Sequence, residues 1–223
     1  MLILALDTST SAIGVAVLAP GSDPVVGVAV DARAHTEKLA PLVRDTLAAA
    51  GATPADLTDL AVGTGPGPFT GLRVGLVTAL TMGHALGIPV HGVGSLDALA
   101  EQALAESSAD DLSELLVATD ARRREVYWAR YARGVDGAVA LTEPAVDRPA
   151  ELPEVVRALP TVGRGPLLYP QLFPNGLGGP LDVDPGWLGR VALQRIASGM
   201  PMPVEPLYLR RPDALTTAER RPS

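Results

Sequence analysis

The chain of 223 residues is 47% hydrophobic, carries a formal net charge of -7 and contains no cysteine. This composition supplies enough apolar side chains for a sizeable core, which excludes a largely disordered chain, and it lacks the basic excess of proteins that bind nucleic acid tightly by themselves. The absence of cysteine excludes disulfides, thiolate metal sites and cysteine nucleophiles. Met1 leads directly into an apolar run without the features of a cleaved leader, so we expect a cytoplasmic protein. Arg73 and His84 interrupt the apolar run at 71–90, which favours a buried helix over a membrane span.

Three strands are predicted in the first thirty residues. Residues 2–7 form a continuous apolar run ending at Asp7, which is typical of a central strand buried on both faces. Apolar runs at 13–18 and 25–30 predict two further strands, and the first two strands are expected to pair as a hairpin. The hydroxyls of Thr8 and Ser9 either bind a phosphate or, as is commoner for such residues, bond their own backbone.

An amphipathic helix is predicted at 36–50. Its apolar residues recur at helical spacing and are Leu39, Leu42, Val43 and Leu47. His35 stands at the helix start, where a cap or surface role is commoner than a ligand role. A short helical segment at 53–57 follows.

A glycine-rich loop follows a short strand at 60–62 and contains Gly65 and Gly67. Thr70 is interpreted as the cap of the next helix. Strand, loop and helix start together predict a phosphate site, because backbone amides and the helix dipole favour an anion there. The pattern matches neither the P-loop nor the dinucleotide fingerprint, and a turn that binds nothing is the alternative.

The helix expected after Phe69 carries small residues every four positions, which are Gly71, Gly75, Ala79, Gly83 and Gly87. Glycine costs roughly 1 kcal/mol inside a helix, so the stripe indicates close packing against either the sheet or a partner. A strand at 90–93 and a helix at 96–105 with Ser95 as its cap complete this half.

The second half begins with the pattern that opened the first. Small and acidic residues at 105–111 mark the boundary, so two subdomains are predicted at 1–105 and 106–223. An apolar run at 115–119 ends at Asp120, and a polar turn containing Arg122, Arg123 and Arg124 leads into a strand at 125–131. A strand at 139–141 follows. Because no clear sequence identity joins the two halves, the repeat is architectural only.

The remaining chain is less informative. We predict a helix at 152–159, a strand entering a glycine turn at 161–165, and a helix at 187–198. The proline-rich segment 166–185 yields no prediction. Residues 206–212 are expected to dock, and the tail from about 213 is expected to be disordered.

Five blocks of the sequence resemble, in the same order, those of the TsaB family, also called YeaZ. They are residues 4–10, 35–39, 63–73, 120–122 and 206–210. The block Gly-Pro-Gly-x-Phe-Thr-Gly-x-Arg is highly specific to this family and its catalytic relative TsaD. The resemblance implies an α/β chain of two tandem RNase H-like subdomains of the actin/sugar-kinase/Hsp70 type, with mixed central sheets flanked by helices.

The resemblance also implies a role in forming N6-threonylcarbamoyladenosine at position 37 of tRNAs that read ANN codons. In that family TsaB is a non-catalytic partner of TsaD, while TsaE supplies an ATPase activity and TsaC supplies threonylcarbamoyl-adenylate. The implied partners are therefore TsaD, TsaE and, through the complex, tRNA. ATP or ADP is possible at the complex, and no cofactor is assigned to this chain.

Departures from TsaD argue against catalysis by this chain. The metal-binding His-x-x-x-His pair of TsaD aligns here with Ser95 and Leu99, and its adjacent acids align with Ser11 and Ala12. The three histidines form no i, i+4 pair and no dense acidic cluster is present, so neither a metal site nor catalytic residues are expected.

The partner surface implied by the resemblance is a helix bundle built from the helices after His35 and Phe69. The residues assigned to it are His35, Leu39, Leu42, Val43, Leu47, Phe69, Leu72, Gly75, Leu76, Ala79 and Gly83. An apolar partner surface that is left unoccupied often pairs with itself, so both a homodimer and a monomer stay open for the chain alone. The three arginines of the turn after Asp120 are assigned to a partner or tRNA contact, with a solvated turn as the alternative.

Two other functions are alternatives to this role. A phosphotransferase of the sugar-kinase/acetate-kinase superfamily would use Asp7 and Asp120 near the phosphates, but the second half offers no convincing adenosine motif. A peptidase would need an assembly of serine, histidine and an acidic residue, and the sequence shows no pattern that predicts one.

Overall fold

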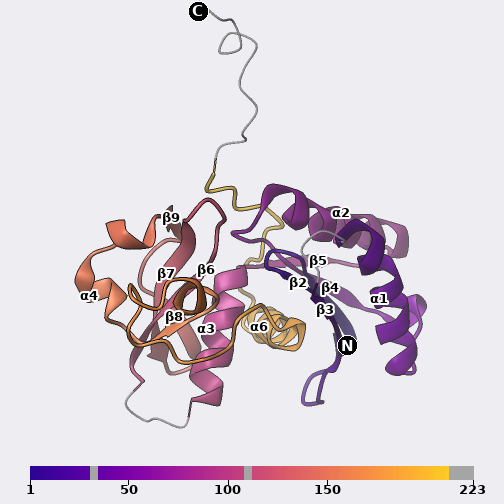
Figure 1. Cartoon of the computed structure of the whole chain (residues 1–223). Coiled ribbons are helices and arrows are strands. Elements are labelled where there is room, and N and C mark those ends of the chain that lie inside the picture. Colours follow the sequence, from indigo (N-terminus) through magenta and orange to yellow (C-terminus); the bar gives the residue numbers. More distant parts are fainter. Residues whose placement is uncertain (31–34, 108–111, 211–223) are drawn as a thin grey trace, which may run out of the picture.

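The structure is a computed structural model that describes residues 1–30, 35–107 and 112–210, and it contains two mixed five-stranded sheets with helices on their faces (Figure 1). This confirms the predicted α/β class. The first sheet has the order β3-β2-β1-β4-β5. Its strands are β1 (Ile3–Asp7), β2 (Ala12–Leu18), β3 (Val25–Val30), β4 (Asp59–Gly63) and β5 (Val90–Val93). The first three strands pair antiparallel, and β4 and β5 run parallel to β1.

The second sheet repeats this start, because β6 pairs antiparallel with β7 and parallel with β10. Its strands are β6 (Glu114–Asp120), β7 (Val126–Gly134), β8 (Gly137–Ala140), β9 (Ala145–Asp147) and β10 (Thr161–Val162). In each half, an apolar first strand therefore ends at an aspartate beside an antiparallel neighbour. Strand β9 was not predicted.

Helices α1 (His35–Ala49) and α2 (Phe69–Leu86) cover the outer face of the first sheet, and α3 (Ser95–Glu106) and α6 (Pro185–Ala197) lie between the two sheets (Figure 1). Every residue of β1 and β2 is buried. This agrees with their continuous apolar runs, which are typical of strands covered on both faces. The short helices are η1 (Pro54–Asp56), η2 (Pro149–Glu151), α4 (Glu154–Arg157) and α5 (Gly165–Leu168).

One hydrophobic cluster joins both halves. It contains side chains of β1 and β2, of β6 and β7, and of α3 and α6 between them. Helix α6, from the second half of the sequence, packs against β1 and β2 of the first sheet. The strands of each sheet fall on one side of residue 106, but the core is shared, and the division into subdomains at 1–105 and 106–223 stays a prediction.

The C-terminal segment crosses back over the first half. The Gly92 amide donates to the Met202 carbonyl at 3.0 Å, and the Leu207 amide donates to the Thr64 carbonyl at 2.9 Å. Residues 202–210, here called the C-terminal strap, therefore lie along β5 and over the glycine-rich loop. The tail expected from about 213 lies outside the described residues.

Two predicted helix caps are wrong. The residue before α2 is Pro68, so Thr70 lies inside the first turn. The residue before α3 is Gly94, and the Ser95 hydroxyl bonds elsewhere. In the segment 166–185, α5 ends at Leu168 and irregular backbone with a cis Gly179–Pro180 bond leads to α6. No helix within the described ranges is long and apolar enough to cross a bilayer.

Candidate functional site

Asp7 is the centre of a buried polar cluster at the carboxyl end of β1. Its side chain accepts hydrogen bonds from the Ser9 amide and hydroxyl, both at 2.8 Å, and from the Ser95 hydroxyl at 2.8 Å. Ser95 in turn accepts from the Gly65 amide at 3.1 Å. Burial raises the pKa of the Asp7 carboxyl, while the hydrogen bonds from Ser9 and Ser95 act in the opposite direction. The cluster joins β1, the glycine-rich loop and α3.

The two loops of the predicted phosphate site pack directly on each other. The Thr8 hydroxyl donates to the Gly71 carbonyl at 2.7 Å and accepts from the Gly75 amide at 3.0 Å, which fixes α2 on the end of β1. A side chain at Gly67 would overlap the backbone of Ser9. The Thr8 hydroxyl therefore bonds the backbone of α2 and the Ser9 hydroxyl bonds the Asp7 carboxylate, so both serve internal contacts, although neither bonds its own backbone as the alternative expected.

The remaining candidates for that site follow the same pattern. Asp7, Thr8 and Ser9 are at most 3% exposed, and Gly65 and Gly67 are buried. Thr70 is exposed in the first turn of α2. The structure thus brings five of the six predicted residues together, but into a packed cluster rather than around an open space.

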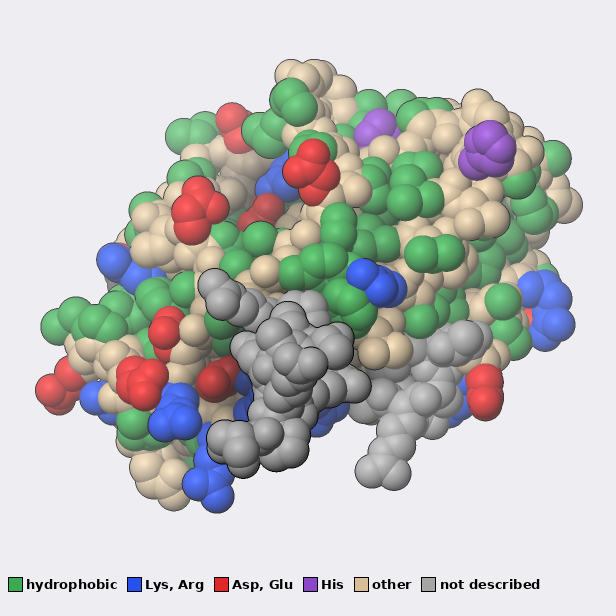
Figure 2. All heavy atoms as spheres, turned by 90° about the horizontal axis from the view of Figure 1, so that it is seen from above, with side chains coloured by type: hydrophobic (Ala, Val, Ile, Leu, Met, Phe, Trp, Pro, Cys, Tyr) green, Lys and Arg blue, Asp and Glu red, His purple; other side chains and the backbone are tan. Residues whose placement is uncertain are grey.

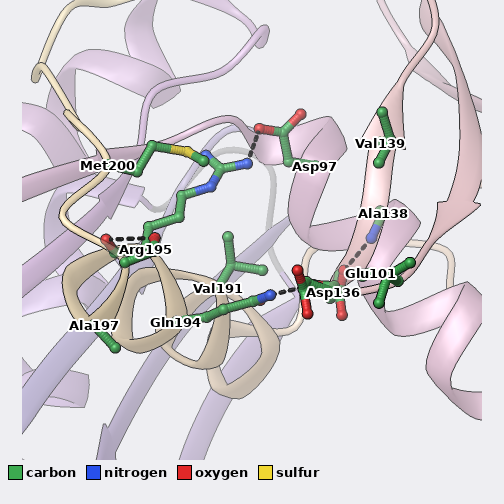
Figure 3. A pocket seen from close by; sticks show the side chains of 13 residues that line it. Asp97, Glu101, Asp136, Ala138, Val139, Val191, Gln194, Arg195, Ala197 and Met200 are labelled. Carbon is green, nitrogen blue, oxygen red and sulfur yellow. Dashed lines mark hydrogen bonds and ion pairs between the residues drawn. The ribbon is translucent and has the colours of Figure 1, made fainter.

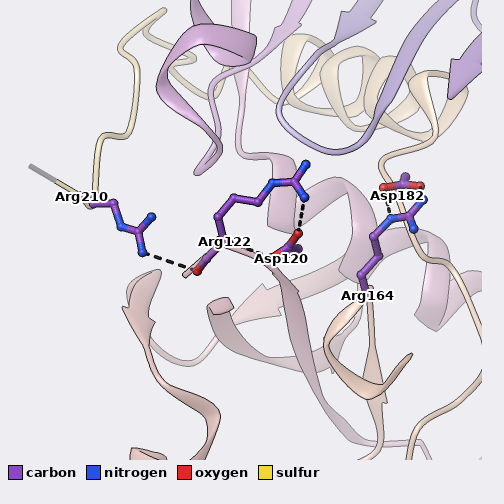
Figure 4. A network of polar contacts seen from close by, with 5 residues as sticks. All are labelled: Asp120, Arg122, Arg164, Asp182 and Arg210. Carbon is purple, nitrogen blue, oxygen red and sulfur yellow. Dashed lines mark hydrogen bonds and ion pairs between the residues drawn. The ribbon is translucent and has the colours of Figure 1, made fainter. Parts of the chain in front are cut away.

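Two arginine side chains, Arg122 and Arg164, line the narrow space between the two halves, and Figure 4 shows them with their acidic partners. Arg164 bonds both oxygens of Asp182, at 2.8 and 2.5 Å, and Arg122 pairs with Asp120 at 3.0 Å. The remaining space, between the β1–β2 turn and the end of β6, is a cavity of about 10 Å³. That is room for one water molecule, whereas small-molecule sites typically occupy about 300–1,000 Å³.

The glycines that follow β10 do not form an adenosine site. A side chain at Gly163 would overlap the carbonyl of Ala118, and one at Gly165 would lie 2.7 Å from the Ala118 side chain. Both glycines allow the loop to pack against β6. Among the described residues, no group of three or more His, Asp or Glu side chains is arranged to hold a metal. His91 instead contacts Asp59 at 2.9 Å.

The turn between β6 and β7 has an unusual backbone. Arg122, Arg123 and Arg124 have φ angles of 62°, 52° and 64°, which lie in the left-handed region. Non-glycine residues pay a steric cost there, because the Cβ atom approaches the following carbonyl. All three side chains are exposed. The sequence indicated the turn but not its conformation, since asparagine and glycine are the usual signals for it.

Most residues assigned to the partner surface lie in the core of the first half. The side chains that are at most 7% exposed are Leu39, Val43, Leu47, Leu72, Leu76 and Ala79. Leu42 is partly buried, and a side chain at Gly75 would meet Thr8 and one at Gly83 would meet Val90. The small-residue stripe therefore packs against the sheet. His35 begins α1, and its side chain lies outside what the structure describes.

The outward side of α1 and α2 carries a different set of apolar residues. A groove of about 470 Å³ runs between the helices and is lined by Leu39, Ala40, Phe69, Thr70, Arg73, Val74, Val77 and Thr78. Phe69, Val77 and Leu80 are 40%, 61% and 46% exposed. Hydrophobic side chains are numerous on the half of the molecule that carries these helices, with few charges among them (Figure 2). We call this surface the α1–α2 face.

An aromatic cluster closes one end of the α1–α2 face. The Tyr208 ring of the C-terminal strap lies 5.0 Å from the Phe69 ring, and the Arg73 guanidinium lies 3.7 Å above Phe69. The Arg73 Nε donates to the Tyr208 hydroxyl at 3.1 Å. Arg210 then pairs with Glu125 in the second half. The strap thus links α2 to the turn between β6 and β7.

A larger cavity, of about 640 Å³, lies between α3, α6 and the β7–β8 turn (Figure 3). Arg195 reaches Asp97 at 2.7 Å, and the Tyr131 hydroxyl donates to the same carboxylate at 2.8 Å. Glu101 accepts from the Ala138 amide at 2.6 Å. These charged groups are paired with groups of the chain itself. They connect α3 with α6, β7 and β8 around the cavity.

Comparisons with known proteins identify the family. Residues 27–159 match the family model described as TsaD: tRNA N6-adenosine threonylcarbamoyltransferase. The tRNA threonylcarbamoyladenosine biosynthesis protein TsaB of Escherichia coli is 35% identical over 94% of this chain and 95% of its own length. An uncharacterized protein of Mycobacterium tuberculosis is 45% identical over 95% of this chain and 93% of its own length. The solved structure of YeaZ from Pseudomonas aeruginosa superposes with a TM-score of 0.79 at 31% identity, covering 93% of this chain and 99% of that chain. The chain therefore belongs to the TsaB (YeaZ) family.

Proposed function

We propose that this chain takes part in N6-threonylcarbamoyladenosine biosynthesis as a non-catalytic partner of TsaD. The observation that carries the proposal is a contrast between two surfaces. The cleft where a nucleotide-dependent relative would hold its substrate has about 10 Å³ left, whereas the α1–α2 face presents exposed apolar side chains beside a groove of about 470 Å³. Exposed apolar surface of this kind marks an interaction site.

The names of the relatives support the biosynthetic role. The Escherichia coli relative is named for tRNA threonylcarbamoyladenosine biosynthesis, and the matching family model is named for the transferase. Within this proposal, TsaE completes the complex, tRNAs that read ANN codons are reached through it, and any ATP or ADP is used there. The proposed compartment is the cytoplasm.

The proposed contact with TsaD uses the outward side of the two helices. Phe69 is retained from the assigned residues because it is exposed, and Arg73, Val77 and Leu80 replace the buried ones. Leu39 and Gly75 support the contact indirectly by fixing α1 and α2 on the sheet. In the absence of TsaD, a second copy of the chain covers the same face.

Reconstitution tests the proposal. TsaD, TsaE, tRNA and threonylcarbamoyl-adenylate are mixed with and without this chain, and modified adenosine is measured in the tRNA digest. We expect modification only when the chain is present, co-elution of the chain with TsaD on size exclusion, and no turnover of ATP by the chain alone. Modification at the same rate without the chain would refute the proposal. ATP hydrolysis by the isolated chain that is lost on Asp7→Ala would favour the phosphotransferase alternative.

A further inference from the structure

Arg73 brings a positive charge to the apolar groove of the α1–α2 face. Its side chain is exposed on the outward side of α2 and lines the groove together with Val77. No acidic residue lines this groove, and helix α2 contains none. Elsewhere in the chain arginines pair with carboxylates, as Arg164 does with Asp182. Within residues 1–30, 35–107 and 112–210, however, no carboxylate lies within ion-pair distance of the Arg73 guanidinium.

Two aromatic rings hold this guanidinium in a fixed orientation. The Arg73 Cζ atom lies 3.7 Å from the centre of the Phe69 ring and 5.8 Å from the centre of the Tyr208 ring. The Nε atom is used by its hydrogen bond to the Tyr208 hydroxyl, whereas Nη1 and Nη2 have no hydrogen-bond partner in the part of the chain that the structure describes. These two nitrogens form an edge that binds a carboxylate through two parallel hydrogen bonds. Because the orientation is set in advance, little rotamer entropy is lost when that edge is used.

The exposed side chains that follow Arg73 along α2 are apolar. Val77 and Leu80 stand at i+4 and i+7 from Arg73, so all three lie along one side of the helix. Val77 is 61% exposed and Leu80 is 46% exposed. A free anion would contact the guanidinium but would leave these apolar side chains uncovered. A helix with apolar residues at matching spacing and an acidic side chain about one turn further along would cover all three.

We infer that the occupant of the α1–α2 face is an amphipathic helix whose apolar side chains cover Val77 and Leu80 and whose Asp or Glu side chain binds Nη1 and Nη2 of Arg73. The inference rests on the proposed function, which makes TsaD the partner, and it adds the chemistry that TsaD presents to this face. The charge pair sets the position of the helix along the groove. A shift by one turn would cover both the guanidinium and the carboxylate without a partner, which is costly, whereas apolar contacts alone tolerate such a shift.

Titration calorimetry with TsaD tests the charge pair. Arg73→Gln removes the charge and should weaken the complex about thirtyfold or more, because a covered carboxylate loses its partner. Arg73→Lys keeps the charge but loses the paired hydrogen bonds, so it should bind more tightly than Arg73→Gln and less tightly than wild type. Added salt should weaken the wild-type complex more than that of Arg73→Gln. Arg148→Gln is the matched control, because Arg148 is a 66% exposed arginine of the second half, and it should leave the affinity unchanged.

A carbodiimide cross-link identifies the group that faces Arg73, and it stays decisive if Arg73→Gln lowers the Tm of the isolated chain. The reagent joins a lysine amine to a carboxylate in contact with it, and Lys38 is the only lysine of the chain. In the complex of Arg73→Lys with TsaD, position 73 should be joined to an Asp or Glu of a TsaD helix. Equal affinities of Arg73→Gln and Arg148→Gln for TsaD would overturn the inference, as would a cross-link from position 73 to a second copy of this chain. Failure of the wild-type chain to bind TsaD would instead refute the proposed function, and the inference with it.

Discussion

Val77 offers the sharpest test of the α1–α2 face as a docking surface. It lies on the outward side of α2, is 61% exposed and lines the groove between the helices. Replacing it with aspartate places a charge in the middle of the apolar contact. The isolated chain should tolerate the change, because valine and aspartate have similar helix propensities and exposed substitutions usually alter stability by no more than about 0.5 kcal/mol.

The expected loss of affinity follows from the exposed fraction of the side chain. Fully burying a valine is worth about 1.5–3 kcal/mol, so covering the exposed three-fifths of Val77 contributes about 1–2 kcal/mol. Removing that contribution alone weakens binding about fivefold to about thirtyfold. A carboxylate in the contact adds a desolvation penalty of several kcal/mol, so Val77→Asp should weaken the pair by more than about a hundredfold.

Val155 supplies the matched control. It is also an exposed helical valine, at 77%, and it lies on α4 in the half of the molecule away from α1 and α2 (Figure 1). Titration calorimetry with TsaD, together with Tm of each isolated variant, should show a lost interaction for Val77→Asp and an unchanged one for Val155→Asp. Equal affinities for TsaD in the two variants would refute the assignment of the face.

Three further changes test the buried cluster and the helix stripe. Burial raises the pKa of Asp7 above its ordinary 3.8, so this carboxyl stabilises the fold below that value and the stabilisation is lost as the pH rises through the folded pKa. Asp7→Asn stays uncharged, so its Tm relative to wild type should rise as the pH increases above the ordinary pKa of 3.8; a difference independent of pH would contradict the burial argument. Ser95→Ala leaves the Asp7 carboxylate and the Gly65 amide each short of a partner, which should cost about 1–3 kcal/mol and lower Tm by about 2–12 °C; an unchanged Tm would show that the hydroxyl is dispensable. Gly75→Leu should destabilise the isolated chain, because its side chain would meet Thr8, and a normally folded variant would mean that α2 can shift on the sheet.

The strands were predictable because burial on both faces leaves a continuous apolar run. Residues 2–7 and 13–18 carry that signal, and β1 and β2 lie there within one residue. Strand β9 was not predicted because it has three residues and pairs with the first three residues of β7, a contact that leaves no local pattern in the sequence. Short strands of this kind depend on long-range pairing rather than on pattern.

The candidate site was predictable only in part, because sequence rules describe interactions between residues that are close together in the chain. A serine before an apolar helix is normally interpreted as its cap, but the Ser95 hydroxyl bonds Asp7, 88 positions away. The stripe containing Gly75 identified the closely packed face of α2, but it did not show which element contacts that face. Apolar periodicity marks the core side of a helix, so the docking side, with its mixture of Arg73 and Val77, carried no comparable signal.

The two aspartates at the strand ends show why little space is left between the two similar halves. Each carboxylate accepts from the amide two residues further on, Asp7 from Ser9 and Asp120 from Arg122. Asp7 is then buried by Ser95, whereas Asp120 is covered by the side chain of Arg122. A shared reaction centre would need both carboxylates to face one open space, and the remaining 10 Å³ is too small for a phosphate group. The two halves are instead joined by the hydrogen bond that the Tyr127 hydroxyl donates to the Gly67 carbonyl at 3.3 Å, and by the contacts of the C-terminal strap with Thr64 and Glu125. A partner on α2 would consequently contact a body that the strap connects to the second half, which is the property expected of a scaffold.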